Sequence, residues 1–168
     1  MKNYILILFL LVSYTTFSQE MTLTKLNEII KEAGDNVELN GSRWNFLINK
    51  KPLIVIADST HNRMRIISPI MEIDKLSEEL KTASLMANFH TALDIKYAIT
   101  DGILWSIYVH PLKELTKGQV IDAMSQVYYG NANFGTTFSS TSLVFPGRRS
   151  NNKEPEKKKE DNKIIEKI

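Results

Sequence analysis

Hydrophobic positions divide this chain into an apolar leader, a patterned middle and a polar tail. The leader is an uninterrupted apolar run from Tyr4 to Val12, preceded by Lys2 and followed by small polar residues up to Ser18. This is the layout of a secretory signal peptide, and the run is shorter than the roughly 20 residues that span a bilayer. We expect cleavage before Gln19 and a periplasmic or secreted mature chain without stable membrane insertion.

Apolar residues recur with helical spacing in three segments of the mature chain. The helices that this spacing predicts cover residues 23–33, 73–89 and 117–129. Thr22 is the expected N-cap of the first helix, and Gly34 is expected to end it in a left-handed conformation. Thr116 and Gln119 have the spacing of a capping box before the third helix.

Short alternating or apolar runs between these helices predict strands. They cover residues 37–39, 44–48, 53–57, 64–68, 93–99 and 103–110. Asn40 and Gly41 predict a tight hairpin turn, as do Asp101 and Gly102 before the last strand. Pro69 is expected to end the fourth strand. The first four strands therefore form a predicted antiparallel meander.

The predicted order is helix, four strands, helix, two strands, helix. It indicates an α+β fold in which an antiparallel sheet carries its helices on one side. We expect a signal peptide at residues 1–18, a single domain at residues 19–146 and a charged tail at residues 147–168. The chain has no cysteine, so it has neither disulfides nor a thiolate nucleophile, and its core alone must stabilise it.

The basic residues are concentrated in the tail. Residues 147–168 hold eight basic and five acidic side chains, whereas residues 19–146 hold twelve basic and fourteen acidic ones. The tail is almost without apolar residues before Ile164, so we expect it to be disordered. It either solubilises or spaces the domain, or it is weakly attracted to an anionic envelope surface. We expect no nucleic-acid partner for an exported chain.

The block from Leu85 to Gly135 resembles the second half of the Tir chaperone (CesT) fold of type III secretion chaperones and their YbjN-like relatives. In that group a helix ending in Leu-x-x-Asn leads into a strand pair, a proline and a final helix. The matching residues here are Leu85, Asn88, Leu93, Asp101, Gly102, Trp105, Pro111, Leu112 and Leu115. With the first helix and the meander, the resemblance covers about residues 21–129.

The resemblance implies a small non-enzymatic dimer that holds extended protein segments or acts as a regulator. Secretion chaperones of this group are cytoplasmic and markedly acidic, whereas this chain has a predicted export signal and is close to neutral. What the resemblance implies here is a role in binding a protein partner in the envelope.

The sequence contains no strong catalytic or metal-binding motif. His61, His90 and His110 are the only histidines, and no pair of them has the i, i+4 spacing of a helical metal site. The serines near residue 140 lack the G-x-S-x-G elbow of a hydrolase, and the glycines do not form a phosphate loop. We therefore expect no cofactor, no metal and no enzymatic activity.

Candidate binding residues lie on the last predicted strand and in the segment after the last helix. Alternation on the strand gives two sets of side chains. The set of Ile103, Trp105, Ile107 and Val109 is apolar throughout and is expected to face the helices. Leu104 and Tyr108 are then expected to form a partly apolar outer surface. Trp44 and Trp105 are both expected to be buried.

The segment from Asn131 to Phe145 is polar with interspersed aromatic residues. It is expected either to pin Phe134, Phe138 and Phe145 onto the core as a loop, or to line a binding surface where exposed aromatic side chains act as anchors.

Two hypotheses of function follow. In the first, the chain is an exported non-catalytic protein-binding domain, chaperone-like or regulatory, that forms a homodimer. In the second, it is an envelope enzyme or a binder of a small ligand or metal that uses His90, His110 and Asp101. The second requires those three side chains within hydrogen-bond reach in a concave pocket.

Overall fold

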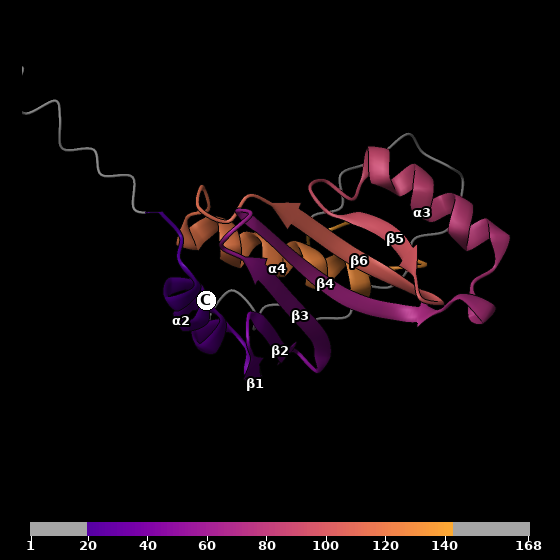
Figure 1. The fold of residues 1–168 in the computed structure, drawn as a ribbon. Coiled ribbons are helices and arrows are strands. Elements are labelled where there is room, and N and C mark those ends of the chain that lie inside the picture. Colours follow the sequence, from indigo (N-terminus) through magenta and orange to yellow (C-terminus); the bar gives the residue numbers. More distant parts are fainter. Residues whose placement is uncertain (1–19, 143–168) are drawn as a thin grey trace, which may run out of the picture.

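The computed structural model describes residues 20–142 and shows a six-stranded antiparallel sheet with three α-helices (Figure 1). Its elements are α2 (Leu23–Ala33), β1 (Asp35–Asn40), β2 (Arg43–Ile48), β3 (Lys51–Asp58), β4 (Arg63–Glu72), the 3₁₀ turn η1 (Ile73–Lys75), α3 (Glu78–His90), β5 (Lys96–Thr100), β6 (Ile103–His110) and α4 (Lys117–Ala132). The strand order in the sheet is β1-β2-β3-β4-β6-β5. The predicted α+β class and element order are confirmed.

Helix α2 begins at its predicted cap, where the Thr22 side chain accepts a hydrogen bond from the backbone N–H of Lys25 at 3.2 Å. It ends differently from the prediction, because Gly34 has φ −106° and is extended rather than left-handed. A Cβ at Gly34 would lie 2.5 Å from Cδ2 of Phe46. Glycine is therefore required here for close packing against β2 and not for a positive φ.

The predicted hairpin turns are present. In the first, Asn40 pairs with Arg43, so the turn is Gly41-Ser42 and lies one residue later than predicted. In the second, Asp101 and Gly102 have φ of 51° and 72°, the left-handed values of a two-residue hairpin turn.

Pro69 does not end the fourth strand, as the sequence had predicted. Strand β4 continues to Glu72, and its pairing with β6 shifts between Pro69 and Met71. The shift is a bulge, where a proline that lacks an N–H is tolerated. The Asn131 side-chain amide donates to the Pro69 carbonyl at 2.7 Å and to Ser68 Oγ at 2.7 Å. The end of α4 thereby anchors the bulge.

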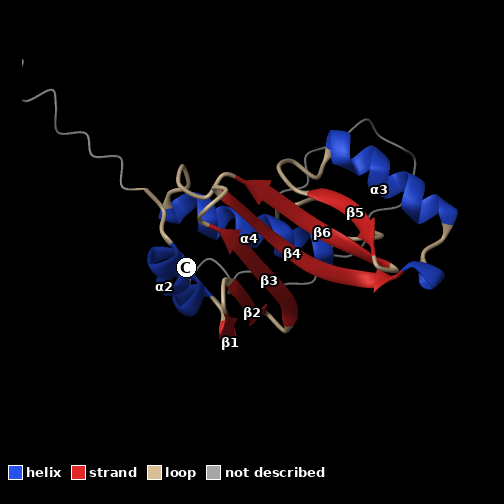
Figure 2. Ribbon diagram, viewed as in Figure 1, coloured by secondary structure: helices blue, strands red, loops and turns tan. Residues whose placement is uncertain are grey.

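Helix α4 lies across one face of the sheet, behind β3, β4 and β6 in the view of Figure 2. It starts at the predicted capping box, in which Thr116 and Gln119 satisfy each other's backbone N–H groups. It passes so close to the sheet that a Cβ on Gly130 would lie 2.5 Å from Cδ1 of Ile95. Helix α2 packs beside α4 and against β1 and β2.

Helix α3 lies beyond the edge strand β5 rather than on the face that α4 covers (Figure 1). It starts at Ser77, whose side chain caps it, and not at Ile73. The Asn88 side chain accepts from the Tyr97 backbone N–H at 2.7 Å and donates to the Tyr97 carbonyl at 3.2 Å. Asn88 thus occupies the free edge of β5 as a neighbouring strand would.

The predicted signal peptide at residues 1–18, the whole charged tail at residues 147–168 and Phe145 lie outside the described residues. Within the described range, no helix is long and apolar enough to cross a membrane.

Candidate functional site

The sheet has one face covered by α4 and one face that no described helix covers. On the covered face, Trp44, Val55, Ile66 and Tyr108 form one row of paired residues across four strands. All four are buried. They belong to a single core that also includes side chains of α2 and α4.

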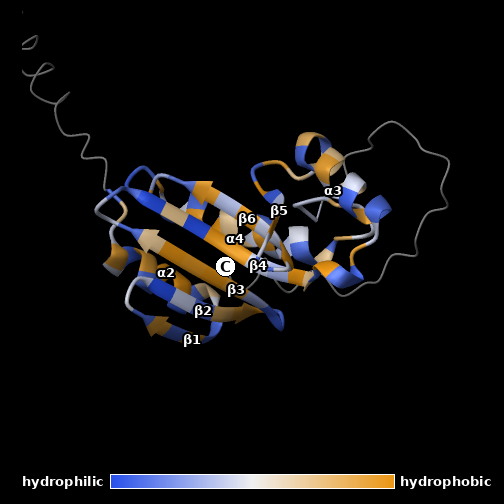
Figure 3. Ribbon diagram, turned by 45° about the vertical axis from the view of Figure 1, so that its right-hand side comes forward, coloured by the Kyte–Doolittle hydropathy of each residue, from blue (hydrophilic) through white to orange (hydrophobic). Residues whose placement is uncertain are grey.

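The opposite face of the sheet, called the open face below, carries an apolar patch. Its apolar members are Ile54, Ile56, Ile67, Trp105, Ile107 and Val109. Ile54, Ile67 and Ile107 are directly opposite one another on β3, β4 and β6. These side chains are half-buried by their neighbours, except Val109, which is 55% exposed. Figure 3 shows the hydrophobic character of β3 within this sheet.

The predicted orientation of β6 is wrong. Leu104 and Tyr108 are 1% and 8% exposed and face the helices, while Trp105 and Val109 lie on the open face. The pairing with β4 decides this, because Tyr108 lies opposite the buried Ile66 and paired residues share a face. Alternation within β6 indicated the opposite orientation, because the uniformly apolar set lies on the open face and the set that contains Ser106 and His110 faces the helices. Leu104 and Tyr108 therefore do not form an outer surface.

Phe134 and Phe138 lie half-buried in the segment after α4. Their rings are 5.4 Å and 6.1 Å from the ring of Tyr97, in edge-to-face contact. The hydroxyl of Thr91 donates to the Phe138 carbonyl at 3.0 Å. The described part of this segment is thus pinned onto the core; a role of these two rings in partner binding stays a prediction.

The two tryptophans differ in burial. Trp44 is buried as expected, and its indole N–H donates to Oδ1 of Asn27 in α2 at 3.0 Å. Trp105 is half-buried on the open face, which makes it the largest side chain of that patch.

Helix α3 exposes three large apolar side chains that the sequence analysis did not single out as a surface. Leu85 is 62% exposed, Met86 is 59% exposed and Phe89 is 87% exposed. In the sequence, Leu80, Ala83 and Ala87 form the apolar stripe of this helix. Leu85, Met86 and Phe89 lie off that stripe, and this offset was the sequence signal that they are exposed. Phe89 contacts only the edge of the His90 ring among the described aromatic pairs.

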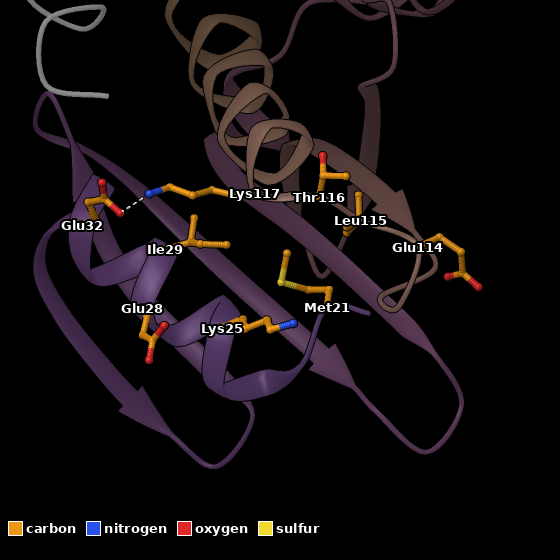
Figure 4. Close-up of a pocket in the computed structure, with 9 residues that line it drawn as sticks. All are labelled: Met21, Lys25, Glu28, Ile29, Glu32, Glu114, Leu115, Thr116 and Lys117. Atoms are coloured by element: carbon orange, nitrogen blue, oxygen red, sulfur yellow. Dashed lines mark hydrogen bonds and ion pairs between the residues drawn. The ribbon is translucent and has the colours of Figure 1, made fainter. Parts of the chain in front are cut away.

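A groove of about 610 Å³ lies between α2 and the start of α4 (Figure 4). Met21, Ile29 and Leu115 give it apolar walls, and Lys25, Glu28, Glu32, Glu114 and Lys117 surround them with charges of both signs. Lys117 Nζ lies 2.6 Å from Oε2 of Glu32, which joins the two helices across the groove. The groove offers apolar contact surrounded by two basic and three acidic side chains.

The histidines do not converge. His110 and Asp101 lie at opposite ends of β6, and His90 ends α3. His61 Nδ1 is 2.7 Å from Oδ2 of Asp58 within an exposed turn, where the backbone N–H of His61 lowers the pKa of the Asp58 carboxyl. In the described range, no three His, Cys, Asp or Glu residues are arranged to hold a metal ion.

No family model matches the sequence, and no curated protein matches it. Solved structures that share the fold include chains of two complexes. A chain in the structure of the HopA1-SchA chaperone-effector complex matches with a TM-score of 0.53 and 13% identity, over 66% of this chain and 90% of that one. A chain in the ExsC-ExsE complex matches with a TM-score of 0.50 and 12% identity, over 68% and 96%. The chain therefore has a secretion chaperone-like α+β fold.

Proposed function

We propose that the mature chain is an exported, non-catalytic binding protein that holds an extended segment of a protein partner on the open face, as a homodimer. The observation that carries the proposal is the apolar open face, where Ile54, Ile67 and Ile107 lie in one row beside Trp105. The fold supports the proposal, because a chain of the same fold occurs in a chaperone-effector complex.

The energetics of the open face are sufficient for binding. Burial of a few hundred Å² of apolar surface stabilises a complex by several kcal/mol at about 25 cal/mol per Å², before the costs of association. Trp105 supplies the type of rigid aromatic side chain that dominates many interfaces. The neighbouring isoleucines present a flat surface on which an extended segment places alternate side chains.

The apolar side chains of α3 support the homodimer. Leu85, Met86 and Phe89 lie on a helix that leaves them uncovered, at the edge of the molecule beyond β5. Two copies related by a two-fold axis would bring the same three side chains of each helix together, which is how most homodimers form. This surface is separate from the open face, so a dimer leaves the open face free for a partner.

One experiment tests export, dimerisation and partner binding together. The affinity-tagged protein is recovered gently from the envelope of its own producer and examined by native mass spectrometry. We expect a polypeptide that begins at Gln19, a dimer, and a stoichiometric protein partner. A monomer that carries a metal or a small molecule would overturn the proposal.

Two variants separate the surfaces. Ile107→Thr with Val109→Thr keeps strand-forming β-branched residues but makes the open face polar; we expect a dimer that has lost its partner. Leu85→Gln with Phe89→Gln is expected to give a monomer. Leu39→Thr, at a 50% exposed position of β1, is the control and is expected to change neither. Partner binding that survives in the open-face variant would contradict the proposed surface.

A further inference from the structure

A polar pocket of about 480 Å³ lies where β6 ends beside α4. Its lining includes Asp94, Asp122, Tyr108 and His110, together with Lys96 and Val109. Val109 belongs to the open face and Tyr108 faces α4, and β5 does not pair with this end of β6, so the pocket lies at a sheet edge that borders the open face. The pocket contains two carboxylates, Asp94 and Asp122, that make no ion pair with a described residue.

The two carboxylates of the pocket are held together without a cation. The side-chain amide of Gln126 donates to Oδ2 of Asp94 at 3.0 Å and to Oδ2 of Asp122 at 2.7 Å. None of the ion pairs between described residues includes Asp94 or Asp122. Lys96, the nearest lysine of the lining, donates instead to the backbone carbonyls of Leu93 and Ile95 at 2.6 Å and 2.9 Å.

Tyr108 adds a polar group that is without a partner. The residue is 8% exposed and lines the pocket, and its hydroxyl makes no hydrogen bond with any described residue. Burial raises the pKa of Tyr108, and the charges of Asp94 and Asp122 raise it further, which places the hydroxyl in the field of both carboxylates. Among the described residues, Ser106 Oγ is the only fully buried side-chain polar atom without a hydrogen-bond partner, so the Tyr108 hydroxyl is reached by solvent in the pocket and is available to a ligand.

His110 lines the pocket beside Tyr108. Its ring stacks on that of Tyr108, with centroids 6.0 Å apart and planes 9° apart. Its Nδ1 lies 2.8 Å from the carbonyl of Pro111 and donates to it, since a carbonyl oxygen only accepts.

We propose that this pocket binds the guanidinium group of an arginine side chain from the protein segment held on the open face. A guanidinium is planar and has five N–H donors, which match two carboxylates and a phenolic oxygen at once. A primary ammonium has three donors around a single point and uses this arrangement less completely. The inference rests on the proposed function, and it defines the chemistry of one partner residue.

The test uses the mature full-length protein and N-acetyl-L-arginine amide as the probe, with binding followed by NMR at the side-chain amide of Gln126 and the ring of Tyr108. We expect saturable millimolar binding that localises to these groups. N-acetyl-L-citrulline amide has the same shape without the charge, and it is expected to bind at least about tenfold more weakly, the loss typical of a charge-assisted hydrogen bond.

Three variants locate the site. Asp94→Asn and Asp122→Asn each keep an oxygen that accepts from Gln126, and each is expected to weaken the arginine probe by about tenfold or more. Tyr108→Phe removes only the hydroxyl and is expected to weaken the probe by roughly threefold to tenfold. Asp101→Asn makes the same charge change at the tip of the β5–β6 hairpin, and there we expect no effect.

Equal binding of the citrulline probe, displacement of the arginine probe by equimolar Mg²⁺, or no binding at millimolar concentrations would each overturn the assignment. Failure here is distinguishable from failure of the proposed function. If a partner still co-purifies and depends on the open face, only the arginine site is wrong. If the arginine probe binds as expected but no partner is ever recovered, the pocket chemistry holds and the partner-binding function is wrong.

Discussion

Helices α3 and α4 have similar apolar content but different surroundings. Eight residues of α4 are buried, against the covered face of the sheet, whereas only Ser84 and Ala87 of α3 are buried. The apolar residues that α3 leaves exposed are Leu85, Met86 and Phe89. An apolar side chain in a helix therefore contributes to the core only when the tertiary fold places an element over it.

The apolar residues of α4 and those of α3 therefore have different roles in the molecule. In α4 the apolar surface stabilises the fold, and substitutions there are expected to lower the free energy of unfolding. In α3 it is available for association, and substitutions there are expected to weaken the dimer while they leave the free energy of unfolding of the monomer nearly unchanged.

The largest expected effect comes from a matched pair of methionines. Met124→Ala in α4 removes a fully buried side chain and is expected to lower the free energy of unfolding by about 2 to 5 kcal/mol. Met86→Ala in α3 removes a side chain that is 59% exposed in the monomer, and it is expected to change the free energy of unfolding of the monomer, measured at a protein concentration at which the dimer dissociates, by less than about 0.5 kcal/mol. Urea unfolding followed by Trp44 fluorescence measures both. Equal losses would show that α3 is also part of the core.

A pair of glycines within α4 tests how closely the helix approaches the sheet. Gly130→Ala places a Cβ 2.5 Å from Ile95 and 2.7 Å from Ser106 Oγ, and it is expected to destabilise the fold by about 1 to 3 kcal/mol. Gly118→Ala meets nothing closer than 4.0 Å and is expected to stabilise it by about 0.5 to 1 kcal/mol. Thermal unfolding of the two variants gives the comparison, and a stabilising Gly130→Ala would contradict this packing.

Local signals in the sequence were enough to predict the elements. The capping box of Thr116 and Gln119, and the turn residues Gly41, Asp101 and Gly102, act within a few positions, so the sequence shows them directly. The predictions at Gly34 and Pro69 were wrong because residues far away in the sequence determine the backbone conformation at these two positions. Phe46 packs against Gly34, and Asn131 anchors the bulge at Pro69.

The candidate site depended on long-range pairing and was predicted less well. The orientation of β6 follows from its register with β4, whereas the alternation of side chains within β6 indicated the opposite face because its uniformly apolar set is the one on the open face. The acidic pocket likewise combines Asp94 and Asp122 through Gln126, residues that are far apart in the sequence and carry no shared motif. Exposure of α3 was visible only in part: Leu85, Met86 and Phe89 lie off the helical stripe, but the pattern does not show whether another element covers them.

Tyr97 links β5 to α4 through a single hydrogen bond, from its hydroxyl to the Gly130 carbonyl at 2.9 Å. Tyr97→Phe is expected to cost about 1 to 2 kcal/mol at neutral pH, because the buried carbonyl loses its donor. Burial also raises the pKa of Tyr97 above its ordinary value of 10.0. Above about pH 10 the unfolded chain loses this proton while the folded chain keeps it, so stability falls as the pH rises.

The alkaline part of this prediction has its own measurement. Urea unfolding at a series of pH values from neutral to about pH 11 is expected to show a shallower loss of stability in Tyr97→Phe than in the unsubstituted protein, since one titrating group is missing. Parallel curves would mean that the Tyr97 hydroxyl titrates alike in both states and is not buried as described.

The smallest expected effect concerns two serines that lie opposite each other under α4, Ser68 and Ser106. Ser68 Oγ donates to the Pro52 carbonyl at 2.7 Å and accepts from Asn131, so Ser68→Ala is expected to destabilise the fold by about 1 to 2 kcal/mol. Ser106 Oγ is buried and has no hydrogen-bond partner among the described residues. Ser106→Ala removes a hydroxyl whose burial is uncompensated, and it is expected to leave stability unchanged or to raise it by about 1 kcal/mol. Chemical denaturation of both variants measures the two changes in the free energy of unfolding. If Ser106→Ala lowers it as much as Ser68→Ala does, the hydroxyl of Ser106 has a hydrogen-bond partner, and the contact between α4 and β6 is more polar than the structure shows.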